Sequence, residues 1–273
     1  MLRIAAPVLA LAMGPSAVMA GDLSLPAPEP QPVFQAPAPS TPNLVFTLRG
    51  GAAVNPDYFG SDDYSVGPDF GFRLGYANLF GREFGNADGS PSYGLGVRGS
   101  FRYIGERDDA DNPELTGLND IDASVELGLG LGYSSYNFDA FADVRYGVIG
   151  HEAVVGELGA DFKVHPSDRL TLSVGPRVFV GSGKYSDVYF GVTPAEAAAS
   201  TSGFTAYDPD GGILSAGVEL GASYEINDQW GVEGAVTWDR LTGDAADSPI
   251  VQAGDRDQYG IRVGITRQIT LDF

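Results

Sequence analysis

Apolar and polar residues alternate with a period of two from Leu44 to the end of the chain. The final segment, residues 258–273, shows the pattern most clearly. Its apolar face carries Tyr259, Ile261, Val263, Ile265, Ile269, Leu271 and Phe273. Arg267 is the only break in that face, and the positions between are glycine, polar or charged. Because successive side chains of a β-strand point to opposite faces, the pattern predicts a strand with one apolar and one polar face.

Nine earlier segments repeat the alternation. They span residues 44–54, 66–80, 93–103, 121–135, 138–148, 154–164, 170–180, 214–226 and 230–238. Most reach the roughly 9–11 residues that a tilted transmembrane strand needs, whereas strands of soluble sandwiches are nearer 5–6 residues. The sequence therefore predicts an all-β fold, a closed antiparallel transmembrane β-barrel of about ten strands. A barrel of about twelve strands is the alternative, because residues 81–92 or 181–213 could hold more.

A few positions interrupt the pattern. Ile104, Phe141, Ile149, Val155 and Phe179 are apolar residues on the polar face. Pro176 lies within a predicted strand and has no amide hydrogen to donate, so we expect a β-bulge there. The rest of the polar face carries both acids and bases, which either pair to fill the lumen or line a narrow channel.

The connections between the predicted strands differ in length. If Leu44 begins on the periplasmic side, the outer connections are residues 55–65, 104–120, 149–153, 181–213 and 239–257. The periplasmic connections, residues 81–92, 136–137, 165–169 and 227–229, are shorter on the whole, as is typical of outer-membrane barrels. In the longest outer loop, Thr193, Pro194 and Glu196 predict a helix that starts with a capping box. That helix either folds over the barrel mouth or stays solvated.

The N-terminal part differs from the rest of the chain. Residues 1–20 have the features of an export signal, with Arg3 followed by an apolar stretch that is too short to span a bilayer. Residues 21–43 are rich in proline and predict an extended periplasmic tail, either a spacer or a docking segment for a partner. The barrel would then span residues 44–273, in the outer membrane of a Gram-negative bacterium.

Composition narrows the possible functions. The chain carries 16 basic and 36 acidic residues, and loss of Arg3 with the signal would change the net charge from −20 to −21. We therefore expect no nucleic-acid partner, because binding nucleic acid needs a basic surface. The chain has no cysteine, which excludes disulfide and thiolate chemistry. Its 38 glycines, 13 tyrosines and 15 phenylalanines fit an all-β chain with many turns and interfacial aromatic residues.

Two histidines are the candidates for catalysis. His151 lies in a predicted outer turn beside Glu152, and His165 lies in a predicted periplasmic turn, so the two cannot share a metal. A barrel hydrolase would need a histidine beside its nucleophile or water, and His151 is the only outer candidate. An isolated histidine in a turn is usually only solvated. We therefore expect no catalytic residue, no metal site and no cofactor.

Four stretches in the predicted outer connections resemble the MipA/OmpV family, which is named after the MltA-interacting protein. They are residues 56–64, 118–122, 189–193 with a following Ser200 and Tyr207, and 241–251. The residues that carry the resemblance are Tyr58, Gly60, Ser61, Tyr64, Tyr189, Phe190, Gly191, Val192, Gly243, Asp244, Asp247, Ser248 and Pro249. The last stretch is the most specific, and the similarity covers roughly residues 44–273.

The resemblance implies an outer-membrane protein surrounded by outer-membrane lipid. The founding member of the family is regarded as a scaffold that brings a lytic transglycosylase, a murein hydrolase, together with a murein synthase. Other members are described as antigens or as affecting antibiotic sensitivity, and no catalytic residues are attached to the family. Resemblance to outer-membrane barrels also makes the terminal Phe273 part of the signal that the barrel-assembly machinery reads.

Three functional hypotheses follow, in order of preference. The first is a structural or scaffolding barrel with murein-remodelling partners in the periplasm. The second is a narrow pore or uptake barrel for small solutes. The third and weakest is a barrel hydrolase that would depend on His151, so the chain is predicted not to be an enzyme.

Overall fold

The computed structural model describes residues 42–79, 81–90 and 92–272. The chain divides into two units, Met1–Pro39 and Ser40–Phe273, and the described residues belong to the second. The predicted signal peptide, the predicted tail as far as residue 41, and Phe273 lie outside the described residues.

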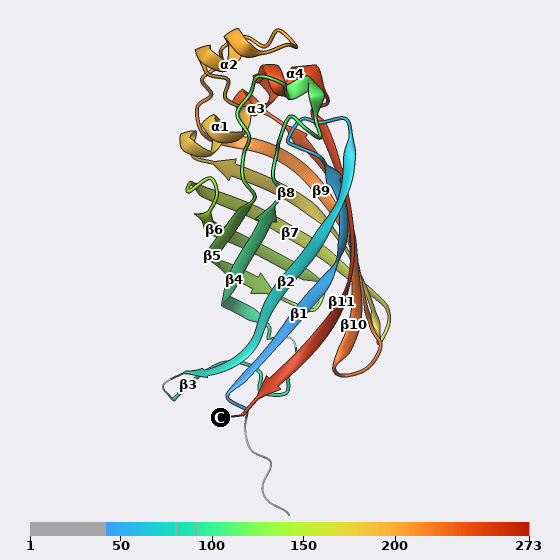
Figure 1. Cartoon of the computed structure of the whole chain (residues 1–273). Helices are drawn as coiled ribbons and strands as arrows, with labels where there is room; N and C mark the ends of the chain where they lie inside the picture. Colours follow the sequence, from blue (N-terminus) through green and yellow to red (C-terminus); the bar gives the residue numbers. More distant parts are fainter. Residues whose placement is uncertain (1–41, 80, 91, 273) are drawn as a thin grey trace, which may run out of the picture. The chain divides into compact units, whose positions relative to one another are not determined.

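The second unit is built on one antiparallel sheet of eleven strands that curls into a barrel wall (Figure 1). The strands are β1 (Leu44–Pro56), β2 (Tyr64–Leu79), β3 (Arg82–Gly85), β4 (Gly94–Ile104), β5 (Ser124–Ser134), β6 (Phe138–Ile149), β7 (Val154–Ser167), β8 (Leu170–Gly181), β9 (Gly212–Glu225), β10 (Trp230–Leu241) and β11 (Asp257–Leu271). The α-helices are α1 (Gly183–Phe190), α2 (Pro194–Ala199), α3 (Gly243–Asp247) and α4 (Pro249–Ala253), and Pro113–Leu115 form a short 3-10 helix. None of the helices in the described part of the chain is long and apolar enough to cross a membrane.

The ten long strands lie at the ten predicted positions, which confirms the predicted all-β fold. The eleventh strand, β3, is short, and it pairs with the end of β2 inside the segment expected to be a turn. Residues 181–213, which could have held further strands, contain α1 and α2 instead. The described residues therefore form eleven strands and not ten, because one turn continues the β2 ladder for four residues.

The ladder joins the two ends of the described chain. The first and last strands pair from Leu44 opposite Leu271 to Val54 opposite Ile261. Hydrogen-bonded neighbours then follow in the order β3-β2-β1-β11-β10-β9-β8-β7-β6-β5-β4. The two edges of this sheet, β2 with β3 and β4, come together through contacts between β2 and β4, and the described residues form no ladder there.

Side chains alternate across the barrel wall as predicted. On β11, the Val263 side chain is exposed on the outer face, whereas Arg262 points inward and pairs with Glu219 on β9. On β5, Leu127 is exposed on the outer face, whereas Glu126 is fully buried. Exposed tyrosine and tryptophan residues near strand ends include Tyr64, Tyr93, Tyr103, Tyr133, Tyr224, Trp230, Trp238 and Tyr259. Such residues suit the two membrane–water interfaces.

The β-bulge expected at Pro176 is absent, and that prediction is wrong. Pro176 lies opposite Val218 on β9, and the register there is constant from Leu170 to Phe179. The register shift in this ladder lies between Phe179 and Val180 instead. On the β7 side, the ladder pauses without changing register, and the Arg177 side chain donates hydrogen bonds to the carbonyls of Ala160 (3.2 Å) and Pro176 (3.0 Å). A side-chain donor thus compensates for the missing amide, so no extra residue is needed.

Candidate functional site

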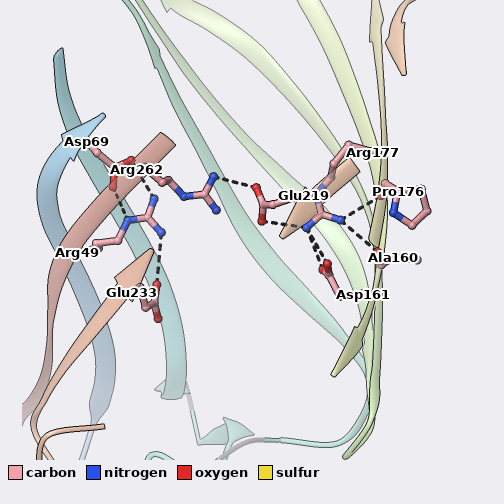
Figure 2. A network of polar contacts seen from close by, with 9 residues as sticks. All are labelled: Arg49, Asp69, Ala160, Asp161, Pro176, Arg177, Glu219, Glu233 and Arg262. Atoms are coloured by element: carbon pink, nitrogen blue, oxygen red, sulfur yellow. Dashed lines mark hydrogen bonds and ion pairs between the residues drawn. The ribbon is translucent and has the colours of Figure 1, made fainter. Parts of the chain in front are cut away.

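Charged side chains cross the lumen in two groups, and ion pairs connect the members within each group (Figure 2). In the first group, Arg49 on β1 binds both carboxylate oxygens of Asp69 on β2, at 2.6 and 3.1 Å. Arg49 also reaches Glu233 on β10 at 3.4 Å, and Arg73 on β2 donates to the other Glu233 oxygen at 2.7 Å. Glu233 therefore joins two arginines from strands that are not its neighbours in the sheet.

The second group continues around the wall. Glu219 on β9 accepts hydrogen bonds from Arg262 on β11 at 2.8 Å and from Arg177 on β8 at 3.0 Å. Arg177 also contacts both carboxylate oxygens of Asp161 on β7. The charges of these two groups are thus paired, and the pairs connect strands across the interior (Figure 2). Such pairing offsets the cost of removing these charges from water.

Glycines beside the arginines make room for these long side chains. A Cβ atom at Gly264 would lie 2.8 Å from Cγ of Arg49, and one at Gly71 would lie 3.1 Å from Cζ of the same residue. Arg49 therefore lies flat across β11 to reach Glu233 because residue 264 has no side chain. Gly71 and Gly264 on the polar face therefore leave the space that the Arg49 side chain occupies.

A third group of charges occupies the interior near β5, β6 and β7. Arg145 donates to Glu126 at 2.8 Å, to Glu157 at 2.9 Å and to Ser100 at 3.0 Å. The side chains of Arg145 and Glu126 are almost completely buried. Ser100 donates in turn to Asp143 at 2.8 Å. These contacts tie β4, β5, β6 and β7 together from the inside.

His151 completes this third group rather than facing solvent. Its Nε2 atom lies 3.2 Å from Glu126 Oε1, and its Nδ1 atom accepts a hydrogen bond from the Ala153 amide at 3.0 Å. The ring is fully buried and packs against Tyr185 and Tyr189. Because Nδ1 is an acceptor, the ring proton is assigned to Nε2, where it is donated to Glu126. Both ring nitrogens are therefore engaged, and neither is free to act as a base.

His165 lies at the other end of the barrel, where its ring stacks on Tyr136 with centroids 4.2 Å apart. The two histidines are therefore separated, as the sequence predicted. Among the described residues, no group of three or more His, Asp and Glu side chains is arranged to hold a metal ion.

The long connections gather at one end of the barrel, the upper end of Figure 1, and pack against one another. We call residues 57–63, 105–123, 150–153, 182–211 and 242–256 the cap. Two apolar clusters lie in the cap and at the adjoining strand ends. The first contains Ala153, Val155, Tyr185, Tyr189, Phe190, Leu214, Leu241, Ala245 and Val251, and the second contains Tyr58, Leu115, Leu118, Val192, Phe204 and Ile250. Val155, Leu214 and Leu241 belong to β7, β9 and β10, so the loops share an apolar core with the ends of these strands.

Arg102 connects the cap to the lumen. Its guanidinium lies over the ring of Phe179, 4.6 Å from the centroid, and over Phe59 of the cap at 5.6 Å. Tyr185 of α1 packs on both rings. Burial raises the pKa of Tyr185 well above its ordinary value, and the nearby Arg102 charge opposes that rise. Phe179, which breaks the polar pattern of β8, thus serves as a stacking partner for an arginine.

Arg107 organises the second half of the cap. It is buried, and it donates to the carbonyl oxygen of Tyr189 at 3.2 Å and to that of Asn119 at 3.5 Å. Burial lowers the pKa of the Arg107 guanidinium, and the Glu196 carboxylate partly opposes this effect. Arg107 therefore links the β4–β5 connection to the end of α1.

Helix α2 begins with the predicted capping box, which is confirmed. The Thr193 hydroxyl accepts from the Glu196 amide at 3.3 Å, and Glu196 accepts from the Thr193 amide at 2.8 Å. Glu196 also accepts from the Asn119 amide at 2.9 Å. Burial acts to raise the pKa of Glu196, but these hydrogen bonds to its carboxylate hold that pKa below its ordinary value. Glu196 thus holds the helix to the β4–β5 connection, while Pro194, Ala195, Ala198 and Ala199 remain exposed.

A protein-family model described as "MltA-interacting protein MipA" matches residues 48–269, which is nearly the whole barrel. The chain belongs to the MipA family.

Two relatives place the family in the outer membrane. Over 224 residues the chain is 28% identical to outer membrane protein OmpV of Vibrio cholerae, covering 78% of this chain and 77% of OmpV. Over 234 residues it is 25% identical to outer membrane protein Omp26La of Vibrio anguillarum, covering 80% and 88% of the two chains. An outer membrane channel from Pseudomonas putida F1 is similar in structure with a TM-score of 0.43 and 12% identity, covering 86% and 100% of the two chains. With its relatives named as outer membrane proteins, this MipA-family chain is an outer-membrane β-barrel protein.

The residues that carried the MipA/OmpV resemblance lie in or beside the cap, and several meet directly. The Ser248 hydroxyl donates to the Phe190 carbonyl at 2.7 Å and accepts from the Ile250 amide at 3.3 Å. Gly60 has a φ of 101°, and a Cβ there would lie 2.7 Å from a Val251 methyl group. Glycine is therefore required at position 60 by both backbone conformation and space.

Other residues that carried the family resemblance contribute to the two apolar clusters or follow the end of a helix. Tyr58 and Val192 lie in one cluster, whereas Tyr189 lies in the other. Burial, and then a hydrogen bond to Glu114, raises the pKa of Tyr58 far above its ordinary value. Ser61 is buried and accepts from the amide of Asp63 at 3.1 Å, and Gly191 follows the end of α1.

The remaining family residues lie at the rim of the cap. Gly243 starts α3 with a φ of 54°, and Asp244 accepts from the Asp210 amide at 2.7 Å. Pro249 occupies the first turn of α4. Asp247 lies 3.7 Å from Arg256 in an exposed pair. Tyr64 begins β2 and is exposed outside the apolar clusters.

Sequence reasoning missed Arg107 and Tyr185. It placed Arg102 on the polar face of its strand but did not identify its partners. Arg107 is an isolated base between Glu106 and Asp108, and this isolation is its only signal in the sequence. The partners of Arg102 and Tyr185 have no signal, because they lie far apart in the chain.

Proposed function

We propose that this protein is a structural or scaffolding barrel of the outer membrane, with murein-remodelling enzymes as its periplasmic partners. The observation that carries the proposal is the filled interior. Paired charges cross the lumen, and the cap has an apolar core at one end. An interior of this kind suits a stable platform better than a wide passage.

The description of the family supplies the class of partner. The founding member's name refers to interaction with MltA, and the notion of a murein hydrolase as partner comes to this chain through family membership. Because murein lies in the periplasm, we place the partner at the barrel end that carries the short turns. The cap then faces outward, as expected of the longer loops of a barrel.

Strand β3 lies at the short-turn end of the barrel, opposite the cap (Figure 1). All four of its residues are exposed, among them the large apolar side chain of Phe84. An exposed aromatic side chain on a short edge strand is a suitable contact for a partner protein. The proline-rich residues 21–43 are the second candidate for such a contact.

A pull-down from solubilised envelopes tests the proposal. The intact protein should retain a lytic transglycosylase and a murein synthase, and Phe84→Ala or deletion of residues 22–42 should reduce retention by roughly tenfold or more. Tyr136→Ala is the matched control, because Tyr136 is an exposed aromatic residue near another short turn. Failure of the intact protein to retain any murein enzyme would reject the scaffolding role.

A narrow pore is the second candidate function. A cavity of about 150 Å³ lies beside Asp69, Thr237 and Arg262, and the Arg73 side chain is 67% exposed. Planar-bilayer recordings separate the two functions. We expect no steady conductance from the scaffolding barrel, whereas a steady conductance whose ion selectivity changes in Arg262→Glu would establish the pore.

A further inference from the structure

The wall has one seam without a hydrogen-bond ladder. Within the described residues, β2 and β4 touch but do not pair, whereas all the other neighbours around the wall are joined. A cavity of about 340 Å³ lies at this seam. It is lined by Phe72 of β2, by Gly99, Ser100 and Phe101 of β4, and by Leu127 and Gly128 of β5. We call these residues the β2–β4 seam.

The cavity is bordered by residues from both faces of the wall. Phe72, Phe101 and Leu127 are exposed on the outer, lipid-facing side. Ser100 belongs to the inner face, where it contacts Asp143 and Arg145. The seam therefore provides a site that an apolar group can enter from the membrane while its other end reaches the lumen.

Small residues and an edge proline keep the seam open. A Cβ atom at Gly99 would lie 3.9 Å from the Phe72 ring, so a larger residue at position 99 would fill the space between the strands. Pro68 lies on β2, and proline in a sheet is characteristic of edge strands because it cannot donate to a ladder. The sequence of β2 thus agrees with an unpaired edge.

Two arginines flank the seam on the lumen side. Arg73 follows Phe72 and Arg98 precedes Gly99, so alternation places both on the inner face, next in sequence to residues that line the cavity. Their side chains are 67% and 43% exposed. Arg73 contacts Glu233 through one nitrogen. Arg98 lies 3.4 Å from Asp143 through its Nε atom, and its guanidinium stacks on the Phe141 ring, 4.2 Å from the centroid. Since a guanidinium has five donor hydrogens, both retain donors for a further acid group.

We propose that the β2–β4 seam binds a single-chain carboxylate amphiphile, such as a long-chain fatty acid. The chain lies against Phe72, Phe101 and Leu127, and the carboxylate meets Arg73 and Arg98. The cavity volume is within the roughly 300–1,000 Å³ of small-molecule sites. An acyl chain matches the apolar outer lining, and the two arginines complement a carboxylate. This site goes beyond the scaffolding role and does not depend on it.

Binding of spin-labelled stearate to the full barrel in phospholipid nanodiscs tests the proposal. Gly99→Leu should weaken binding by about tenfold, because it fills the cavity. Gly156→Leu is the control, since Gly156 lies on the outer face of β7 at a position that is paired with both neighbouring strands, with its nearest neighbours at 3.5 Å or more. Equal affinity in the two variants would overturn the site.

The headgroup is tested with the methyl ester of the same probe. Arg98→Leu should weaken the acid by about tenfold and leave the ester unchanged, because only the acid carries a charge for Arg98. If acid and ester bind the wild-type barrel equally well, the carboxylate assignment is overturned, and the seam holds an acyl chain of any membrane lipid.

A cross-linked variant keeps the proposal testable if Gly99→Leu does not fold. Phe72→Cys with Gly99→Cys assembles as a reduced protein, and a short thiol cross-linker then joins the seam. Cross-linking should abolish probe binding. The control pair is Val97→Cys with Leu131→Cys, which lies across the existing β4–β5 ladder. Unchanged binding after seam cross-linking, confirmed by mass, would reject the site.

Discussion

The cap and the lumen are both interiors, but they are stabilised by different forces. The cap buries aromatic and aliphatic side chains from five loops, as at Ile250 and Phe190, which are almost wholly inaccessible. The lumen holds paired charges from regular strands, as at Arg145 and Glu126. An apolar cluster tolerates irregular backbone if it is well packed, whereas a lumen of charges requires each partner at a fixed register. We therefore expect the cap to unfold locally, and the barrel around the lumen to unfold cooperatively.

The largest effect is expected in the lumen. Arg145→Leu leaves Glu126 and Glu157 without their arginine partner, and removing one partner from a buried ion pair costs roughly 3–5 kcal/mol. Urea unfolding, followed by heat-modifiable gel migration, measures the loss. Arg240→Leu, which removes a more exposed pair with Asp257, should cost no more than about 1 kcal/mol. Equal losses would remove the distinction between buried and exposed pairs.

The cap counterpart is Ile250→Ala. Truncation of this fully buried side chain should cost roughly 2–5 kcal/mol, but the loss should be confined to the cap. Protease cleavage of the outer loops in intact membranes should increase, while the gel shift of the barrel stays normal. Ile213→Ala, at an exposed isoleucine of β9, is the matched control. A barrel that unfolds together with the cap would contradict the idea of two independent interiors.

A substitution on the lipid-facing side tests the alternation of side chains across the barrel wall. Val263→Arg should destabilise the barrel by roughly 2–4 kcal/mol if residue 263 lies near the bilayer midplane. The Val263 side chain is 56% exposed on the lipid face, whereas Arg262 points inward to Glu219. Single cysteines at positions 263 and 262 should therefore differ in labelling by a lipid-soluble reagent. Equal labelling would disprove the alternating faces.

The smallest effect concerns pH in the cap. The pKa of Glu196 in the folded protein lies below its ordinary value, about 4.3 in an unfolded chain. The carboxylate thus contributes stability above that ordinary pKa, and this contribution is lost as pH falls through the folded-state pKa. The hydrogen-exchange protection factors of residues 193–200 should fall below about pH 4. In Glu196→Gln the protection of these residues should depend less on pH. An unchanged pH dependence in that variant would mean that another group causes it.

The strands could be predicted because each is a local pattern. Alternation around Val263 and Leu127 depends only on neighbours in the sequence, and the structure confirms both. The capping box of Thr193 and Glu196 is likewise local. The cap contacts of Arg102 and Arg107 were not predictable, because these partners belong to loops that meet only after the barrel forms. The β-bulge at Pro176 was wrongly predicted, because the Arg177 side chain provides the hydrogen-bond donor that the Pro176 backbone lacks.

The position of the β2–β4 seam has a consequence for how the wall is held shut. The pairing of β1 with β11 closes a loop of nearly the whole described chain, and it is a continuous ladder. The unpaired edges, in contrast, belong to strands that are close neighbours in the sequence. Loop-closure entropy grows with the logarithm of loop length, so the long-range pairing bears the larger entropic cost and the seam the smaller. Because no ladder holds β2 to β4, the wall can open there while β1 and β11 stay hydrogen-bonded. Reclosing the seam then orders only the short stretch of chain between β2 and β4.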